Sequence, residues 1–194
     1  FDSYESDGFS AGGFIREFVD FKRGTETDIF SIRRQSEGIY ALLHYLRYEK
    51  EHGRKHPGLE RKITAVLNTF LQLQATDGSF PRKFRDDRTT VDASGGSTPS
   101  ATLPLVMAYR YFGDKRYLAA AEKTARYLES EIIGKADYFS STLDANCEDK
   151  EASLYAATAM YYLALASDKA SREHYTAMAR KAAYFALSWY YLWD

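Results

Sequence analysis

Between Asp77 and Pro99 the chain reads DGSFPRKFRDDRTTVDASGGSTP, and this is its one long segment without a helical period. Loops of this length inside a compact domain are uncommon and are usually functional or disordered. The segment carries Phe80 and Phe84 among basic and acidic side chains, a mixture that a passive tether does not need. We therefore expect it to form the floor or rim of a substrate cleft between two helical regions.

Apolar residues on both sides of this loop recur at intervals of three and four, which indicates helices with one buried face. We predict six helices, over about 27–50, 59–74, 98–111, 115–133, 147–166 and 170–193, and expect Pro104 to kink the third or delay its start. Segment 1–26 is rich in glycine and phenylalanine, and its period does not distinguish a short helix from a strand. It is treated as an N-terminal extension, and 27–194 as the helical domain.

The spacing of these helices predicts an all-α fold, an array of three antiparallel helical hairpins. Connections are short within each hairpin and long between hairpins, which places the long loops at one end with the N-termini of the first, third and fifth helices. Helix N-termini offer unsatisfied N–H groups, and long loops supply side chains. We expect the ligand site at that end.

Composition disfavours several classes of function. The net charge of -1 provides no basic field for nucleic acid, and no apolar run approaches the roughly 18 to 20 residues of a membrane span. The four histidines lack metal-ligand spacing, and no glycine-rich phosphate loop is present. We expect no metal, no cofactor, no nucleic-acid partner and no membrane span.

The run LQLQATDGSFP, from Leu71 to Pro81, resembles the helix-to-loop segment of α/α toroid proteins, where Gln followed by Asp-Gly-Ser and an aromatic residue closes a hairpin. The best fit is the six-hairpin glycosidase superfamily, which includes secreted polysaccharide-degrading enzymes of gut bacteria. DANCEDKEA, from Asp144 to Ala152, has a similar character. The first motif also marks terpene-cyclase-like toroids and non-catalytic relatives.

The resemblance spans about residues 27–194 and implies a partial toroid, because a full toroid has six hairpins and this chain has three. We expect the missing part of a larger chain, or a second subunit, to cover the inner helices. An extracytoplasmic location, periplasmic or secreted, is implied by the resemblance only.

The resemblance also implies a glycoside hydrolase acting on a polysaccharide or oligosaccharide, with two carboxylates as general acid and base. The candidates at the expected cleft end are Asp92 in the long loop, and Glu148 and Asp149 at the start of the fifth helix. Acidic residues in a first helical turn are also favoured by the helix dipole, and Asn146 can cap that helix. Analogy with the family favours inversion.

Other residues at this end are candidates for substrate binding. Arg33, Arg34 and Glu37 are suited to sugar hydroxyls or to the carboxylate of an acidic sugar, and equally to ion pairs that hold the loops. Aromatic rings can stack on sugars, although most aromatic residues belong to cores. The remaining candidates are Asp77, Phe80, Phe84, Arg85, Tyr138 and Asp144.

Two rival functions stay open at this point. One is a polysaccharide lyase on the same scaffold, in which a Tyr, His or Arg base replaces the acid pair. The other is a non-catalytic helical domain that binds glycan or protein. Facing carboxyl groups in a cleft would favour hydrolysis, and a basic cleft with Tyr or His would favour elimination.

Overall fold

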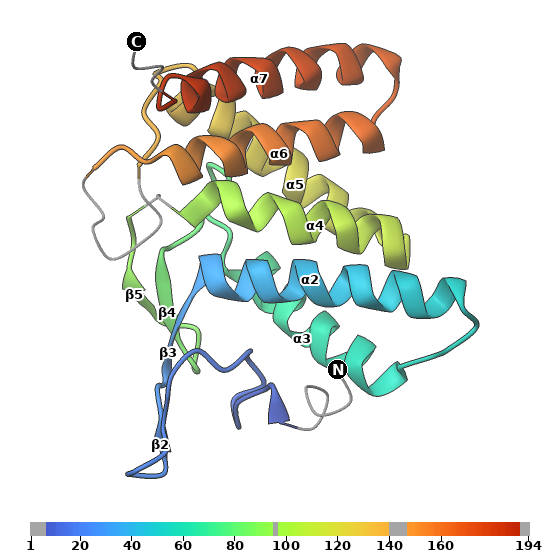
Figure 1. The fold of residues 1–194 in the computed structure, drawn as a ribbon, viewed down its shortest axis with the longest axis vertical. Coiled ribbons are helices and arrows are strands. Elements are labelled where there is room, and N and C mark those ends of the chain that lie inside the picture. The colour runs from blue at the N-terminus through green and yellow to red at the C-terminus, as the bar shows by residue number, and fades with distance from the viewer. Residues whose placement is uncertain (1–6, 95–96, 140–146, 191–194) are drawn as a thin grey trace.

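The computed structural model describes residues 7–94, 97–139 and 147–190 (Figure 1). Its helices are α2 (Ile32–Glu51), α3 (Pro57–Leu73), α4 (Thr98–Phe112), α5 (Lys115–Tyr127), α6 (Lys150–Ala166) and α7 (Lys169–Leu187). A π-helical segment, η2 (Leu128–Ile133), continues α5, and the strands are β1 (Val19–Asp20), β2 (Thr25–Glu26), β3 (Ile29–Ser31), β4 (Lys83–Arg85) and β5 (Thr90–Asp92). The predicted array of helical hairpins is confirmed.

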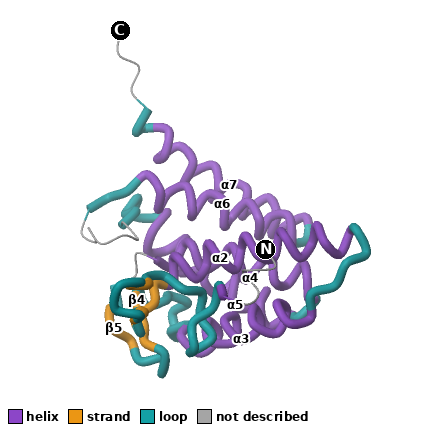
Figure 2. The backbone as a smooth tube through the Cα atoms, turned by 60° about the horizontal axis from the view of Figure 1, so that its bottom comes forward, coloured by secondary structure: helices purple, strands orange, loops and turns teal. Residues whose placement is uncertain are grey.

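Helices α2, α4 and α6 lie side by side, α3 and α5 lie behind them, and α7 packs against α6 at the edge of the array (Figure 1). Helix α4 is the centre of the packing, and every side chain from Thr98 to Ala108 is buried. The starts of α2, α4 and α6 lie at one end, beside the strands, as the loop lengths predict (Figures 1 and 2). This end is called the helix-start end below.

Capping residues set where the helices begin. Ser31 is extended, at φ −101° and ψ 135°, and its side chain accepts from the Arg34 amide, so α2 starts at Ile32. The prediction that this helix begins at residue 27 was therefore wrong, because residues 29–31 form strand β3. Pro104 lies inside α4, which starts at Thr98, so it does not delay the helix. None of the helices within the described residues is both long and apolar enough to cross a membrane.

The long loop after α3 contains a small antiparallel sheet with strand order β3-β4-β5. Phe30 pairs with Phe84, and Lys83 pairs with both Ser31 and Asp92. The Phe14 ring lies 4.9 Å from the Phe30 ring and 5.1 Å from the Phe84 ring, between centroids. This aromatic cluster anchors the sheet at the helix-start end.

The N-terminal segment packs along α2. The Gln35 side chain accepts from the Ile15 amide at 2.9 Å and donates to the Ile15 carbonyl at 2.7 Å, both in the interior. Phe14 and Ile15 are buried in the same core as the helices. The segment therefore extends the hydrophobic core beyond the helical hairpins.

The Gln-x-x-Asp-Gly-Ser motif joins α3 to α5. The Gln74 side-chain Nε2 donates to the Ala120 carbonyl at 2.9 Å and to the Thr124 hydroxyl at 2.8 Å. Asp77 closes the turn by accepting from the Ser79 amide at 2.9 Å. Gly78, at φ +98°, lies against the Lys123 backbone, where a Cβ would be 2.3 Å from the carbonyl oxygen. The motif is thus explained by helix packing.

Candidate functional site

Asp92 ends strand β5 at the helix-start end, and its side chain is 32% exposed. Its Oδ1 accepts from the Ser94 amide at 2.9 Å, and its Oδ2 lies 3.6 Å from Nη1 of Arg82. Hydrogen bonds from the Ser94 backbone and side chain lower the pKa of Asp92, and the charges of Arg82 and Lys83 add to this effect. Asp92 is therefore an ionised, accessible carboxylate at neutral pH.

Arg82, beside Asp92, was not singled out by sequence reasoning. Its side chain is 5% exposed, although arginine is almost never fully buried unless paired. Its backbone joins two elements, because the Arg82 amide donates to the Asp92 carbonyl at 2.8 Å and the Arg82 carbonyl accepts from the Ile32 amide at 3.1 Å. The sequence signal was weak, since Arg82 is one of several basic residues in the loop.

Glu148 and Asp149 lie at the start of α6, at the same end of the array. Asp149 caps this helix, and its Oδ1 accepts from the Glu151 amide at 2.9 Å. The predicted start at residue 147 and the predicted Asn146 cap are corrected, because α6 begins at Lys150. Glu148 is exposed and forms an isolated β-bridge with Phe139. Of this pair, Glu148 has its carboxylate on the surface while Asp149 serves as a cap.

A polar cluster connects the first turns of α2 and α6. Arg33 Nε lies 3.0 Å from Glu37 Oε1, and Arg33 Nη2 lies 2.8 Å from Glu151 Oε2. The Tyr155 hydroxyl donates to Glu37. The predicted grouping of Arg33 with Glu37 at this end is thus seen, as an ion-paired cluster that crosses between two helices.

Two members of this cluster, Arg33 and Tyr155, have raised pKa values. Burial opposes the positive charge of Arg33, but the contributions of Glu37 and Tyr155 together outweigh it and raise the Arg33 pKa. Burial and the Glu37 carboxylate raise the pKa of Tyr155 to about 12. Tyr155 is therefore a neutral hydrogen-bond donor near neutral pH. Glu151 and Tyr155 were missed by sequence reasoning.

Arg34 faces away from this cluster, and its guanidinium carbon lies 4.5 Å from the centroid of the Phe18 ring. Beside it, the Glu17 carboxylate accepts from the Ser31 backbone amide at 2.7 Å and from the Gln35 side-chain Nε2 at 3.1 Å. Burial raises the pKa of Glu17. The contacts of Arg34 with Phe18 and of Glu17 with Ser31 and Gln35 hold the N-terminal segment on α2. These residues are not next to Asp92, because strand β4 lies between Ser31 and Asp92 in the sheet.

Three predicted stacking residues are core residues instead. Phe80, Phe84 and Tyr138 are 1%, 0% and 1% exposed, so a sugar cannot reach their rings in this structure. Phe80 and Phe84 are buried because their loop folds back on the helices and encloses its own aromatic side chains. Tyr138 comes from a different loop and packs on Phe185 of α7, with 4.3 Å between ring centroids.

The other predicted binding residues are dispersed. Asp77 lies in the turn after α3, next to a hollow of about 350 Å³ that is also lined by Arg126, Tyr127, Ser130 and Glu131. Arg85 pairs with Asp28 on the exposed side of the sheet. Asp144 lies outside the described residues.

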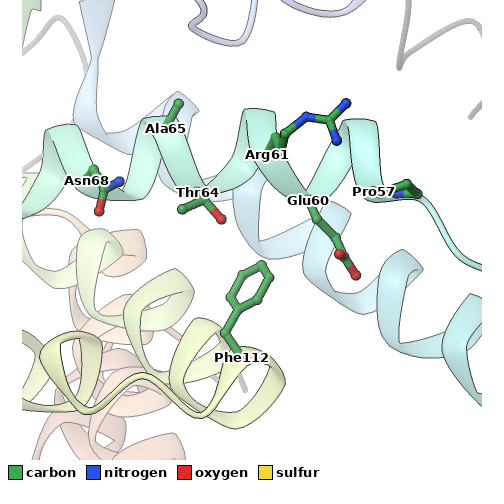
Figure 3. Close-up of a pocket in the computed structure, with 7 residues that line it drawn as sticks. All are labelled: Pro57, Glu60, Arg61, Thr64, Ala65, Asn68 and Phe112. Carbon is green, nitrogen blue, oxygen red and sulfur yellow. The ribbon is translucent and has the colours of Figure 1, made fainter.

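A surface hollow of about 450 Å³ lies between α3 and the end of α4, with Phe112 pointing toward α3 (Figure 3). Its one carboxylate, Glu60, already accepts from the Tyr111 hydroxyl at 2.6 Å. The other polar side chains that line this hollow are Arg61, Thr64 and Asn68. Across residues 7–94, 97–139 and 147–190, no group of three His, Cys, Asp or Glu side chains is arranged to hold a metal ion.

Two solved structures share this fold. The unsaturated glucuronyl hydrolase from Bacillus sp. GL1, responsible for the degradation of glycosaminoglycan, matches with a TM-score of 0.73 at 15% identity, over 100% of this chain and 55% of its own. An unsaturated glucuronyl hydrolase specific for heparin matches with a TM-score of 0.70 at 17% identity, over 96% of this chain and 53% of its own. No family model and no curated protein matches the sequence.

The chain thus spans about half the length of the solved structures that it matches. At these identities the similarity concerns the fold, and the resemblance to α/α toroid proteins is confirmed at that level.

Proposed function

We propose that this chain is carbohydrate-active and forms part of a glycoside hydrolase in which Asp92 is the ionised catalytic carboxylate. The observation that carries the proposal is the position of Asp92, a partly exposed carboxylate with a lowered pKa, at the helix-start end of a fold shared with two glycoside-cleaving enzymes. Glycoside hydrolysis needs one ionised and one protonated carboxyl group. Glu148 is proposed as the second group, because Asp149 is occupied as a cap.

The state of Tyr155 favours hydrolysis over elimination. A lyase requires a base at this end, and Tyr155 is the tyrosine that lies in the cluster with Arg33. With a pKa of about 12 and its hydroxyl donated to Glu37, Tyr155 does not accept a proton near neutral pH. The cluster is better suited to donating hydrogen bonds to sugar oxygens.

The test is an activity assay on plant and host glycans, including oligosaccharides that end in an unsaturated glucuronyl residue. New reducing ends report hydrolysis, and new ultraviolet absorbance from a conjugated double bond reports elimination. We expect reducing ends, and a decrease in kcat of about 10²- to 10⁴-fold in Asp92→Asn. Glu148→Gln should show a similar loss.

The matched control is Asp168→Asn, at the α6–α7 turn away from the helix-start end (Figure 1). Asn is also a good helix cap, so this variant removes a carboxylate with little effect on α7. Full activity in both Asp92→Asn and Glu148→Gln would refute the site assignment. New absorbance without hydrolysis would favour the lyase, and binding without turnover would favour the non-catalytic domain.

Further helical hairpins are proposed to pack on the α6–α7 edge. Large apolar side chains along this edge are exposed: Leu154 (42%), Tyr161 (52%) and Leu165 (46%) on α6, and Tyr184 (70%) and Leu187 (58%) on α7. Exposed apolar patches commonly mark interaction sites. The support from the comparisons is that both solved structures have nearly as much chain again beyond the matched part. The extracytoplasmic location stays a prediction from the resemblance.

A further inference from the structure

Arg82 has an unusual environment for a charged side chain. It is 5% exposed, its Nε has no hydrogen-bond partner within the described part of the chain, and the carboxylate facing it is Asp92. Arginine side chains carry a fixed positive charge. Burying a charge is unfavourable unless an opposite charge compensates it. The Arg82 charge and the Asp92 charge are therefore energetically linked.

The backbone contacts of Arg82 do not explain why its side chain is arginine. The amide and carbonyl of Arg82 join β5 to the start of α2, and any residue with an N–H group would make those bonds. An apolar side chain would avoid the unfavourable burial of the guanidinium. What the guanidinium adds is a fixed positive charge 3.6 Å from Asp92 Oδ2.

The two oxygens of Asp92 have different surroundings. Oδ1 is held by the Ser94 amide at 2.9 Å. Oδ2 faces Arg82 at 3.6 Å, which is longer than a direct hydrogen bond. Lys83, on β4, is the other cation that acts on this carboxylate. Oδ2 thus lies beside the positive charge of Arg82 without a direct hydrogen bond to it.

We propose that Arg82 is a positioning residue for Asp92: its buried charge faces Oδ2 and holds the carboxylate in the orientation in which it acts on the reacting water or sugar hydroxyl. This inference rests on the proposed function for its catalytic consequence, but the coupling between Arg82 and Asp92 is testable without activity.

The direct test is nuclear magnetic resonance of the side-chain carboxyl of Asp92 during a pH titration of the whole chain. In Arg82→Gln the Asp92 midpoint should rise, because a neighbouring positive charge lowers the pKa of an aspartate. Arg82→Lys keeps the charge and should keep most of the shift. Arg116→Gln is the matched control, because Arg116 pairs with Asp114 at the start of α5. It should leave the Asp92 midpoint unchanged.

Loss of folding in Arg82→Gln would not prevent the test. In the wild-type protein, the Arg82 Nε signal should shift with the same midpoint as the Asp92 carboxyl, since protonation of Asp92 removes the charge facing it. A flat Arg82 signal across that titration would overturn the proposal. An Asp92 midpoint equal in Arg82→Gln and Arg116→Gln would also overturn it.

The activity arm separates this inference from the proposed function. If Asp92 is the base, Arg82→Gln should move the acidic midpoint of the kcat/KM profile to higher pH, by the same amount as the Asp92 carboxyl midpoint. Arg82→Lys should return the acidic midpoint to its wild-type pH. Full activity of Asp92→Asn would refute the catalytic role while the carboxyl titration still decides the coupling. An unchanged acidic limb in Arg82→Gln, with Asp92→Asn inactive, would refute the role of Arg82 alone.

Discussion

Replacing Gly78 by alanine should destabilise the protein more than replacing any glycine in an open turn. Gly78 has φ +98°, and an added Cβ would lie 2.3 Å from the Lys123 carbonyl oxygen and 2.8 Å from its carbon. Both atoms belong to the backbone of α5, so a side-chain rotation cannot relieve the contact. The left-handed backbone costs a non-glycine residue about 1–2 kcal/mol, and overpacking adds about 1–3 kcal/mol. We expect Gly78→Ala to lower the free energy of unfolding by about 2–5 kcal/mol.

Gly53→Ala is the matched control for this prediction. Gly53 also has a positive φ, +74°, but an added Cβ would meet no atom within 4 Å. Only the conformational cost remains, about 1–2 kcal/mol. The assay is urea unfolding of the three proteins followed by circular dichroism at 25 °C. A Gly78→Ala variant no less stable than Gly53→Ala would refute the inference that the Asp-Gly-Ser turn is held against α5.

Two further perturbations test the α2–α3 turn and the exposed edge. Hydrogen bonds from Arg54 and then from His56 lower the pKa of Glu49 from an ordinary 4.5 to about 2. Because the pKa is lower in the folded state than in the unfolded state, ionised Glu49 stabilises the folded protein fully above pH 4.5. This stabilisation is lost as the pH falls toward 2. The stability difference between wild type and Glu49→Gln in urea should thus be largest near pH 7 and shrink below pH 4.5, and a constant difference would contradict this. Tyr161→Glu with Leu165→Glu, at positions 52% and 46% exposed, should change the free energy of unfolding by less than about 1 kcal/mol while reducing self-association at high concentration. Light scattering that shows a monomeric wild type under the same conditions would argue against self-association through this edge.

Much of the helical framework was predictable because its signals are local. Helix periodicity, the caps at Asp114 and Asp168, and the left-handed Gly113 after α4 all act within a few residues. Connection length then decides which helix starts share an end. For the same reason Asp92, Glu148 and Arg33 could be assigned to one end of the array before their contacts were known.

The tertiary structure alone decided which of those residues meet and which are buried. Strand β3 pairs with β4 across more than fifty residues of sequence, and three-residue strands are too short to show an alternating pattern. Phe84 has the same sequence signal as a binding residue or as a core residue, and only the folding of the sheet onto the helices buries it. The pairing of Arg33 with Glu151, and the burial of Arg82 against Asp92, likewise depend on how distant segments approach. Helix positions follow from interactions within a few residues, whereas the electrostatics of the site arise from contacts that no local sequence pattern encodes.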